Sequence, residues 1–293
     1  MKKMNYVLFT DTDTDATPEF AEEYGYKLIS MPYTIGEKEV YPYQDFDKFE
    51  GHKFYDMLRN GEMPKTSGLS PITYENYFEP YLKKGKDILY VHFSAAMSGT
   101  FSAMNLALES LKEKYPNNNV YTIDTKGITI LSYNIVKQVG KLYKQGKTIE
   151  EILSWAETEV DKFAIYFFAN DLKFFKRSGR VKAFPAFMGN LLGIRPIMNM
   201  GVDGMMKALE KTRGLKPTMD RIVNYVVTTQ DDIFNYEVVI GHTDCFDTAK
   251  ILAEKLQEKF DNKLNIEFVM VNPTAGSHCG PDGIGVCFHA KGR

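Results

Sequence analysis

Short apolar runs alternate with segments of helical periodicity through the first half of the chain. Strand-like runs occupy residues 6–9, 28–35, 87–93 and 120–123. The helical segments cover 98–115, 128–144 and 149–162; the first has apolar residues at Phe101, Met104, Leu108 and Leu111. Pro32 interrupts the second run and predicts an edge strand there. Alternation of this kind predicts a mostly parallel sheet with helices on both faces.

The pattern changes near residue 160. We predict strands at 163–169, 237–241, 265–271 and 284–288, a short helical turn at 172–176, and helices at 218–227 and 247–260. Residues 194–200 and 205–210 flank Gly201-Val-Asp-Gly204, which predicts a hairpin with a four-residue loop. We therefore expect two domains, 1–160 and 161–293.

Composition narrows the class of protein. The 293 residues carry a net charge of −2 and include 20 Phe and 18 Tyr, which excludes both wholesale disorder and a general nucleic-acid binder. Three cysteines are too few for a disulfide framework. We find no signal peptide, and the longest apolar stretches, such as 164–169, are too short to span a membrane. We expect a soluble, cytoplasmic protein.

Several motifs resemble metal-binding or catalytic motifs, but none of them matches such a motif fully. Asp11, Asp13 and Asp15 with Glu22 have the spacing of a calcium loop, yet Ala16 stands where the turn needs glycine. The same aspartates could supply the nucleophile of a magnesium-dependent phosphatase, or they could satisfy loop backbone and cap the helix that Pro18 begins. The spacing of the histidines and cysteines between 278 and 289 fits no common zinc finger. We expect no metal and no cofactor.

Two hydroxyl-rich segments are better suited to bind an anion than the motifs above are to bind a metal ion. Thr66-Ser67-Gly-Leu-Ser70-Pro71 precedes a helix, and Ser98-Gly99-Thr100 joins the strongest strand to a strongly amphipathic helix. A helix N-terminus at the carboxyl end of a strand favours negative charge, and glycine allows close approach. Helix capping is the alternative role for each hydroxyl.

Two further segments are distinctive. The sequence from Gly276 to Gly285 is so rich in glycine that it predicts a tight loop, with His278 able to donate to a carboxylate. Residues 171–221 hold 11 Lys and Arg against 4 Asp and Glu. Such a segment is either a solvated face or a docking surface for an acidic partner.

Taken in order, these segments resemble the DegV family of bacterial fatty-acid-binding proteins over nearly the whole chain. The resemblance rests on these segments: 9–11, 66–71, 97–103, 172–181, 193–197, Gly204, Lys211, Arg213 and 278–283. Three places depart from the family pattern, namely Gly68-Leu69, Ser178 and Asp282. We expect Asp282 to bring negative charge near the ligand carboxylate.

The resemblance implies an α/β protein of two domains, an N-terminal mostly parallel α/β/α sheet domain and a C-terminal mixed-sheet α/β domain, with the ligand between them. It implies a carrier without enzymatic activity, a monomer, that presents a long-chain fatty acid to a separate fatty acid kinase for acyl-phosphate formation and phospholipid synthesis. Transient proximity to a membrane is compatible with that role. The ligand-binding residues would be Thr66, Ser67, Ser98, Gly99, Thr100 and His278. The kinase would bind at Lys176, Arg177, Arg180 and Arg213.

The residue types agree with an acyl ligand. A Met- and Phe-rich stretch could line an adaptable tunnel or belong to an ordinary core: Phe184, Phe187, Met188, Leu191, Leu192, Ile194, Ile197, Met198, Met200, Met205 and Met206. At ~0.8 kcal/mol per methylene, a chain of about fourteen gains roughly 11 kcal/mol before ordering costs. A hydrolase that uses Ser98 with His278 as base, or Asp11 as nucleophile, remains the alternative.

Overall fold

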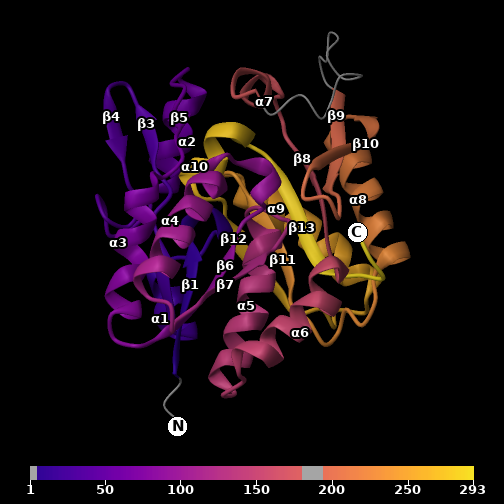
Figure 1. Ribbon diagram of the computed structural model, residues 1–293. Coiled ribbons are helices and arrows are strands. Elements are labelled where there is room, and N and C mark those ends of the chain that lie inside the picture. Colours follow the sequence, from indigo (N-terminus) through magenta and orange to yellow (C-terminus); the bar gives the residue numbers. More distant parts are fainter. Residues whose placement is uncertain (1–4, 180–193) are drawn as a thin grey trace.

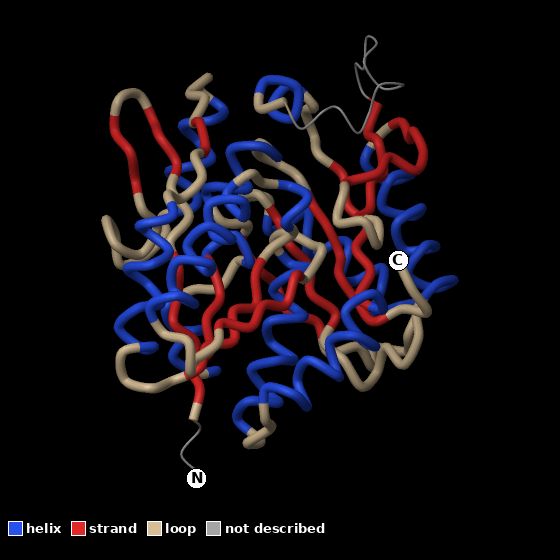
Figure 2. The backbone as a smooth tube through the Cα atoms, viewed as in Figure 1, coloured by secondary structure: helices blue, strands red, loops and turns tan. Residues whose placement is uncertain are grey.

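A computed structural model of the protein describes residues 5–179 and 194–293. It contains a four-stranded parallel sheet, a six-stranded mixed sheet and a small three-stranded sheet. Figure 1 and Figure 2 show helices packed around the strands of both larger sheets. The fold class predicted from the sequence is thereby confirmed as α/β with a parallel sheet and a separate mixed sheet. Within the described ranges, no helix combines the length and apolar character needed to cross a membrane.

The parallel sheet belongs to the first half of the chain. Its order is β2 (Tyr26–Ile29), β1 (Tyr6–Asp11), β6 (Asp87–His92) and β7 (Val120–Asp124). The run with Pro32 divides into β2 and β3 (Tyr33–Ile35), and β2 is an edge strand as predicted. Successive side chains of each strand point to opposite faces of the sheet. Leu8, Leu89 and Val91 therefore pack in one core, and Phe9 and Ile88 pack in another.

Helices cover both faces of this sheet. One face packs against α3 (Pro71–Leu82) and α4 (Thr100–Lys114), and the other against α1 (Pro18–Tyr24) and α5 (Ile130–Lys144). The caps are side chains with oxygen acceptors: Ser70 caps α3, and Thr148 forms a capping box with Glu151 at the start of α6 (Ile149–Glu159). Thr17, not the preceding aspartates, caps α1, so that part of the sequence prediction was wrong.

The mixed sheet belongs to the second half. Its order is β10 (Met206–Arg213), β9 (Ile194–Met200), β8 (Phe163–Phe168), β13 (Ile284–His289), β11 (Val238–His242) and β12 (Ile266–Met270). Strands β9 and β10 form the predicted antiparallel hairpin, although five residues rather than four separate them, because β10 begins at Met206 and not at Met205. Helices α8 (Leu215–Thr229) and α9 (Phe246–Lys259) cover one face, and α5 lies against the other. Because α5 also packs on the parallel sheet, one hydrophobic core joins both sheets.

Four elements escaped the sequence patterns. They are β4 (Lys38–Val40) and β5 (Lys65–Thr66), which flank β3 in the small sheet, helix α2 (Gly51–Arg59), and helix α10 (Pro273–Cys279). Three 3-10 turns, at Thr12–Thr14, Ala95–Met97 and Val160–Lys162, and the short helix α7 (Lys173–Arg177) complete the described elements. Helix α10 contacts α2, β5 and α7, so it connects the last part of the chain to the first.

A buried polar contact ties these parts together. Asp15 Oδ1 accepts hydrogen bonds from the backbone N–H of Asn272 at 2.9 Å and from its Nδ2 at 2.7 Å. The Asn272 side chain in turn caps α10 by accepting from Ala275 N–H. Burial raises the pKa of Asp15 to about 7, although both hydrogen bonds from Asn272 oppose that rise.

This pKa gives a pH-dependent contribution to stability. Asp15 binds a proton more tightly in the native than in the unfolded chain, so its contribution to the unfolding free energy falls as pH rises from about 4 to about 7, by up to ~1.4 kcal/mol per pH unit. We expect urea denaturation to show that Asp15→Asn gains stability relative to the unsubstituted protein over that window. A stability difference that stays constant, or changes in the opposite direction, would contradict the buried contact.

Candidate functional site

The site lies where the chain's course across the parallel sheet reverses. From β1 the chain passes to β2 on one side of it and later to β6 on the other. At such a point the loops beyond the two strands diverge and leave a crevice. The residues that follow β1 and β6, among them Asp13, Phe93 and Ser98, line a cavity there.

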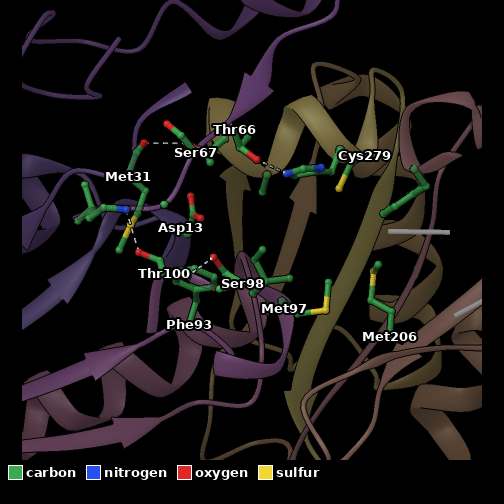
Figure 3. Close-up of a pocket in the computed structure, with 18 residues that line it drawn as sticks. Asp13, Met31, Thr66, Ser67, Phe93, Met97, Ser98, Thr100, Met206 and Cys279 are labelled. Atoms are coloured by element: carbon green, nitrogen blue, oxygen red, sulfur yellow. Dashed lines mark hydrogen bonds between the residues drawn. The ribbon is translucent and has the colours of Figure 1, made fainter. Parts of the chain in front are cut away.

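The cavity has a volume of about 360 Å³, within the range of small-molecule sites. All six predicted ligand-binding residues line it: Thr66, Ser67, Ser98, Gly99, Thr100 and His278. They come from three separate parts of the chain, namely β5 with the loop after it, the start of α4, and α10 (Figure 3). The structure thus brings together residues that are up to 212 positions apart.

Three polar residues of the cavity lining, Thr66, Ser98 and His278, are here called the polar end of the cavity. Thr66 Oγ1 and His278 Nε2 are 3.0 Å apart, and the Ser98 hydroxyl accepts from Thr100 N–H at 3.3 Å. Each hydroxyl keeps hydrogen-bonding capacity for a ligand oxygen, because a hydroxyl has one proton and two lone pairs. The Nε2 atom of His278 is engaged by Thr66, which is not the partner that a hydrolase with Ser98 as nucleophile requires.

Thr100 and Ser67 have more structural roles than predicted. Thr100 Oγ1 is buried, accepts from Leu69 N–H at 2.9 Å and lies 3.0 Å from the Tyr74 hydroxyl. Gly68 passes so close to Thr100 that an added Cβ would lie 3.1 Å from the threonine Cβ, so glycine permits this contact. Ser67 Oγ donates to Glu39 at 3.1 Å. Thr100 therefore fixes the loop that carries Thr66.

The glycine-rich segment is not a tight loop throughout, because its first part forms α10. Asn272 caps this helix, Pro273 occupies its first turn, and it ends at Gly280, which has a φ of +71°. Gly276 lies against Tyr55, whose hydroxyl would be 2.5 Å from an added Cβ. Glycine is therefore required for close packing of α10 on α2, and that packing sets the position of His278.

Asp282 does not lie at the polar end of the cavity as expected. Its carboxylate accepts from Arg59 Nη2 of α2 at 2.8 Å, and the same guanidinium binds Asp244 through Nη1 at 2.6 Å. These ion pairs raise the pKa of Arg59 and hold α2 against the loops of the mixed sheet. Asp282 thus contributes to the contact between the two parts of the chain.

A second, smaller apolar cavity of about 60 Å³ adjoins the first. The two share Ile128, Phe175, Met206 and Cys279. The smaller one lies over the mixed sheet and α5, and side chains such as Ile130, Ile165 and Phe167 line it. Its walls are almost wholly apolar, so it suits a hydrocarbon chain.

The predicted tunnel residues are only partly confirmed as lining. Met200 and Met206 line the cavities, but Ile197 and Met198 are fully buried in the cores and Met205 is 39% exposed. Phe184, Phe187, Met188, Leu191 and Leu192 lie outside the described residues. Strand periodicity explains the position of Ile197, which faces the opposite side of β9 from Met200. Met198 packs in the same core as Met200 but does not line either cavity.

The three aspartates of the 11–15 segment have separate environments. Asp11 is fully buried, accepts from Tyr90 Oη, Phe93 N–H and Asp13 N–H, and has a pKa raised to about 7 by burial. Asp15 binds Asn272, and Asp13 lines the larger cavity. Among the described residues, the group close enough to share a metal ion is instead His52, Asp56 and Asp244, where Arg59 already occupies the carboxylates.

The basic segment lies beside the cavity. Helix α7 directs Phe175 into both cavities and leaves Lys176 and Arg177 exposed. Arg213, at the end of the edge strand β10, is exposed as well, and Arg180 lies outside the described residues. The four acidic residues of 171–221 each form an ion pair with a Lys or Arg, so the excess charge of this segment remains positive.

Sequence reasoning did not assign several lining residues to the ligand site, and these residues have similar positions in the fold. Asp13, Phe93 and Ile128 each follow the carboxyl end of one of the parallel strands β1, β6 and β7. The rule that ligands bind beyond these ends could have identified all three. Phe175 and Cys279, in contrast, reach the cavity only because α7 and α10 pack together, which no local pattern indicates.

Comparison with known proteins agrees with the motifs. A DegV domain-containing protein of Clostridium perfringens is 31% identical over 289 residues, covering 98% of each chain. A DegV family protein of Ruminococcus gnavus solved with vaccenic acid has a TM-score of 0.84 at 23% identity, covering 97% of this chain and all of the other. A stearic acid-binding protein of Eubacterium ventriosum has a TM-score of 0.85 at 21% identity, covering 98% of each chain. These structures share the fold of this chain.

The family assignment rests on sequence as well as fold. The model of the DegV family, described there as uncharacterised, matches residues 5–291. That match spans both larger sheets and every residue that lines the cavity. The chain therefore belongs to the DegV family.

Proposed function

We propose that this protein binds one long-chain fatty acid, with its carboxyl group at Thr66, Ser98 and His278. The observation that carries the proposal is a cavity lined by hydroxyls and His278 that shares four lining residues with a neighbouring apolar cavity. Related structures support the ligand class, because the Ruminococcus gnavus protein was solved with vaccenic acid and the Eubacterium ventriosum protein of the same fold binds stearic acid. The acyl chain would lie between the domains 1–160 and 161–293, along Phe175 and Met206.

The affinity would come mainly from the acyl chain. Each methylene moved from water into the apolar cavity contributes ~0.8 kcal/mol, whereas hydrogen bonds to a charged group contribute about 1.5–3 kcal/mol each. The hydroxyls instead fix which end of the ligand faces the polar cavity. They also avoid a buried carboxylate without donors, which would cost several kcal/mol.

We further propose that the carboxylate is presented to a separate fatty acid kinase in the cytoplasm. Thr66 and Ser98 carry no charge, so they leave the carboxylate more nucleophilic than a Lys or Arg clamp would. The exposed Lys176, Arg177 and Arg213, with Arg180, would orient an acidic kinase surface beside the cavity. In this role the protein acts as a monomeric carrier and the kinase performs the chemistry.

The ligand can be identified directly. We expect protein purified from a bacterial host, denatured and extracted, to yield an equimolar amount of fatty acid by mass spectrometry. Extracts without fatty acid, together with Ser98-dependent turnover of an ester panel, would instead favour a hydrolase.

Ser98→Ala tests the polar end. Loss of one hydrogen bond to the carboxylate should weaken fatty acid binding roughly tenfold, about 1.4 kcal/mol, without lowering the melting temperature. Ser102→Ala, on the exposed side of α4, is the matched control and should bind normally. Equal affinities of both variants would place the carboxyl group elsewhere.

Reversal of charge on α7 tests the docking surface. Lys176→Glu with Arg177→Glu should leave fatty acid loading unchanged and slow acyl-phosphate formation by the kinase, most strongly at low ionic strength. Lys83→Glu with Lys84→Glu makes the same charge change near the opposite end of the parallel sheet and should have no effect. Loss of loading, or equal kinase rates for both pairs, would contradict the assignment.

A further inference from the structure

Two glycines face each other in the middle of the mixed sheet. Gly241 of β11 and Gly285 of β13 are paired in the antiparallel register, and both line the smaller, apolar cavity. Because neither carries a side chain, the two strands present bare backbone to the cavity at this row. Glycine in the interior of a strand weakens the sheet, and it is typical of a place where another group approaches the backbone closely.

Ile130, the first residue of α5, lies against this glycine pair. A Cβ added to Gly241 would be 2.6 Å from Ile130 Cγ2, and a Cβ added to Gly285 would be 3.5 Å from Ile130 Cδ1. Ile130 is only 1% exposed, packs in the core that joins both sheets and lines the smaller cavity. The glycines therefore make room for the isoleucine side chain, whose position decides how much of the cavity stays open.

Ile130 lies at the inner end of the path from the polar end of the cavity. It lines only the smaller cavity, whereas the passage between the two cavities is lined by Ile128, Phe175, Met206 and Cys279. The next row on the same face of the sheet is filled by the paired residues Val239 and Cys287. Both are fully buried, and neither belongs to the described lining of the two cavities. An acyl chain that comes through the passage therefore meets Ile130 before a closed wall.

The backbone before Ile130 is held in a strained conformation. Thr129 has a φ of +53°, which is unfavourable for a β-branched residue. Its N–H donates to the Asp13 carbonyl at 2.9 Å, and its own carbonyl accepts from Tyr133 N–H at 2.8 Å. Ile128 and Ile130, on either side of Thr129, both line the smaller cavity. Such strain persists only where the surrounding structure fixes it, so Ile130 is held in one place.

We propose that Ile130, seated on Gly241 and Gly285, determines the length of the acyl chain that this protein binds. This inference rests on the proposed function and adds the side chain at which the methyl end of the fatty acid stops. Each methylene that leaves water for the apolar cavity raises the affinity about fourfold. A methylene beyond the limit meets Ile130 and stays outside the apolar cavity, so the affinity stops rising at one chain length.

Dissociation constants of delipidated protein for each saturated fatty acid from dodecanoate to eicosanoate test this inference. They should fall with chain length up to a break and then level off or rise. Ile130→Ala opens the inner end of the cavity and should move the break to chains roughly two carbons longer, which then bind about fifteenfold more tightly than to the unsubstituted protein. Ile135→Ala is the matched control: it changes an equally buried isoleucine of α5 in the same core, outside the described lining, and should leave the break in place. Ile130→Val and Ile135→Val serve if the alanine variants do not fold.

The outcomes separate this inference from the proposed function. A break at the same chain length in the folded position-130 variant and the unsubstituted protein would overturn the role of Ile130 and leave the fatty acid carrier intact. An equal shift in the position-135 variant would also overturn it, because a loosened core rather than Ile130 would then set the limit. Absence of binding to the unsubstituted protein at every chain length would overturn the proposed function, and the inference with it.

Discussion

A carboxylate can leave water only if the protein supplies hydrogen bonds or charge in its place. Under the proposed function, that constraint accounts for a polar end of the cavity that is assembled from three distant parts of the chain. Thr66 comes from β5, Ser98 precedes α4, and His278 belongs to α10. The cores, the caps and the contacts between the two sheets hold these three side chains around one cavity.

Several tight contacts maintain that assembly. Thr100 holds the loop that carries Thr66, and the Asp15–Asn272 contact holds the start of α10. Close packing at Gly276 then brings α10 against Tyr55 of α2. Since these contacts join the beginning, the middle and the end of the chain, the site forms only when both larger sheets are in place.

Much of the fold could be predicted from the sequence, because the spacing of apolar residues within a short segment indicates whether that segment is a helix or a strand. The strands of the parallel sheet, the hairpin around Gly201 and the larger helices follow from it. Helix α10 was missed because Gly276 lowers helix propensity, although Asn272 and Pro273 form a recognisable start. The position of Asp282 was predicted wrongly, because closeness to His278 in the sequence does not determine which way the Asp282 side chain points. Asp282 has a φ of +63°, and its carboxylate pairs with Arg59.

The central claim is that a carboxyl group occupies the polar cavity while its hydrocarbon chain follows the apolar one. A crystal structure of the protein loaded with a fatty acid tests it most directly. The account predicts carboxyl oxygens within hydrogen-bonding distance of Thr66 Oγ1 and Ser98 Oγ, with the chain passing Phe175 and Met206. A ligand bound in the reverse direction, or a cavity closed by the protein's own side chains while lipid binds elsewhere, would contradict it.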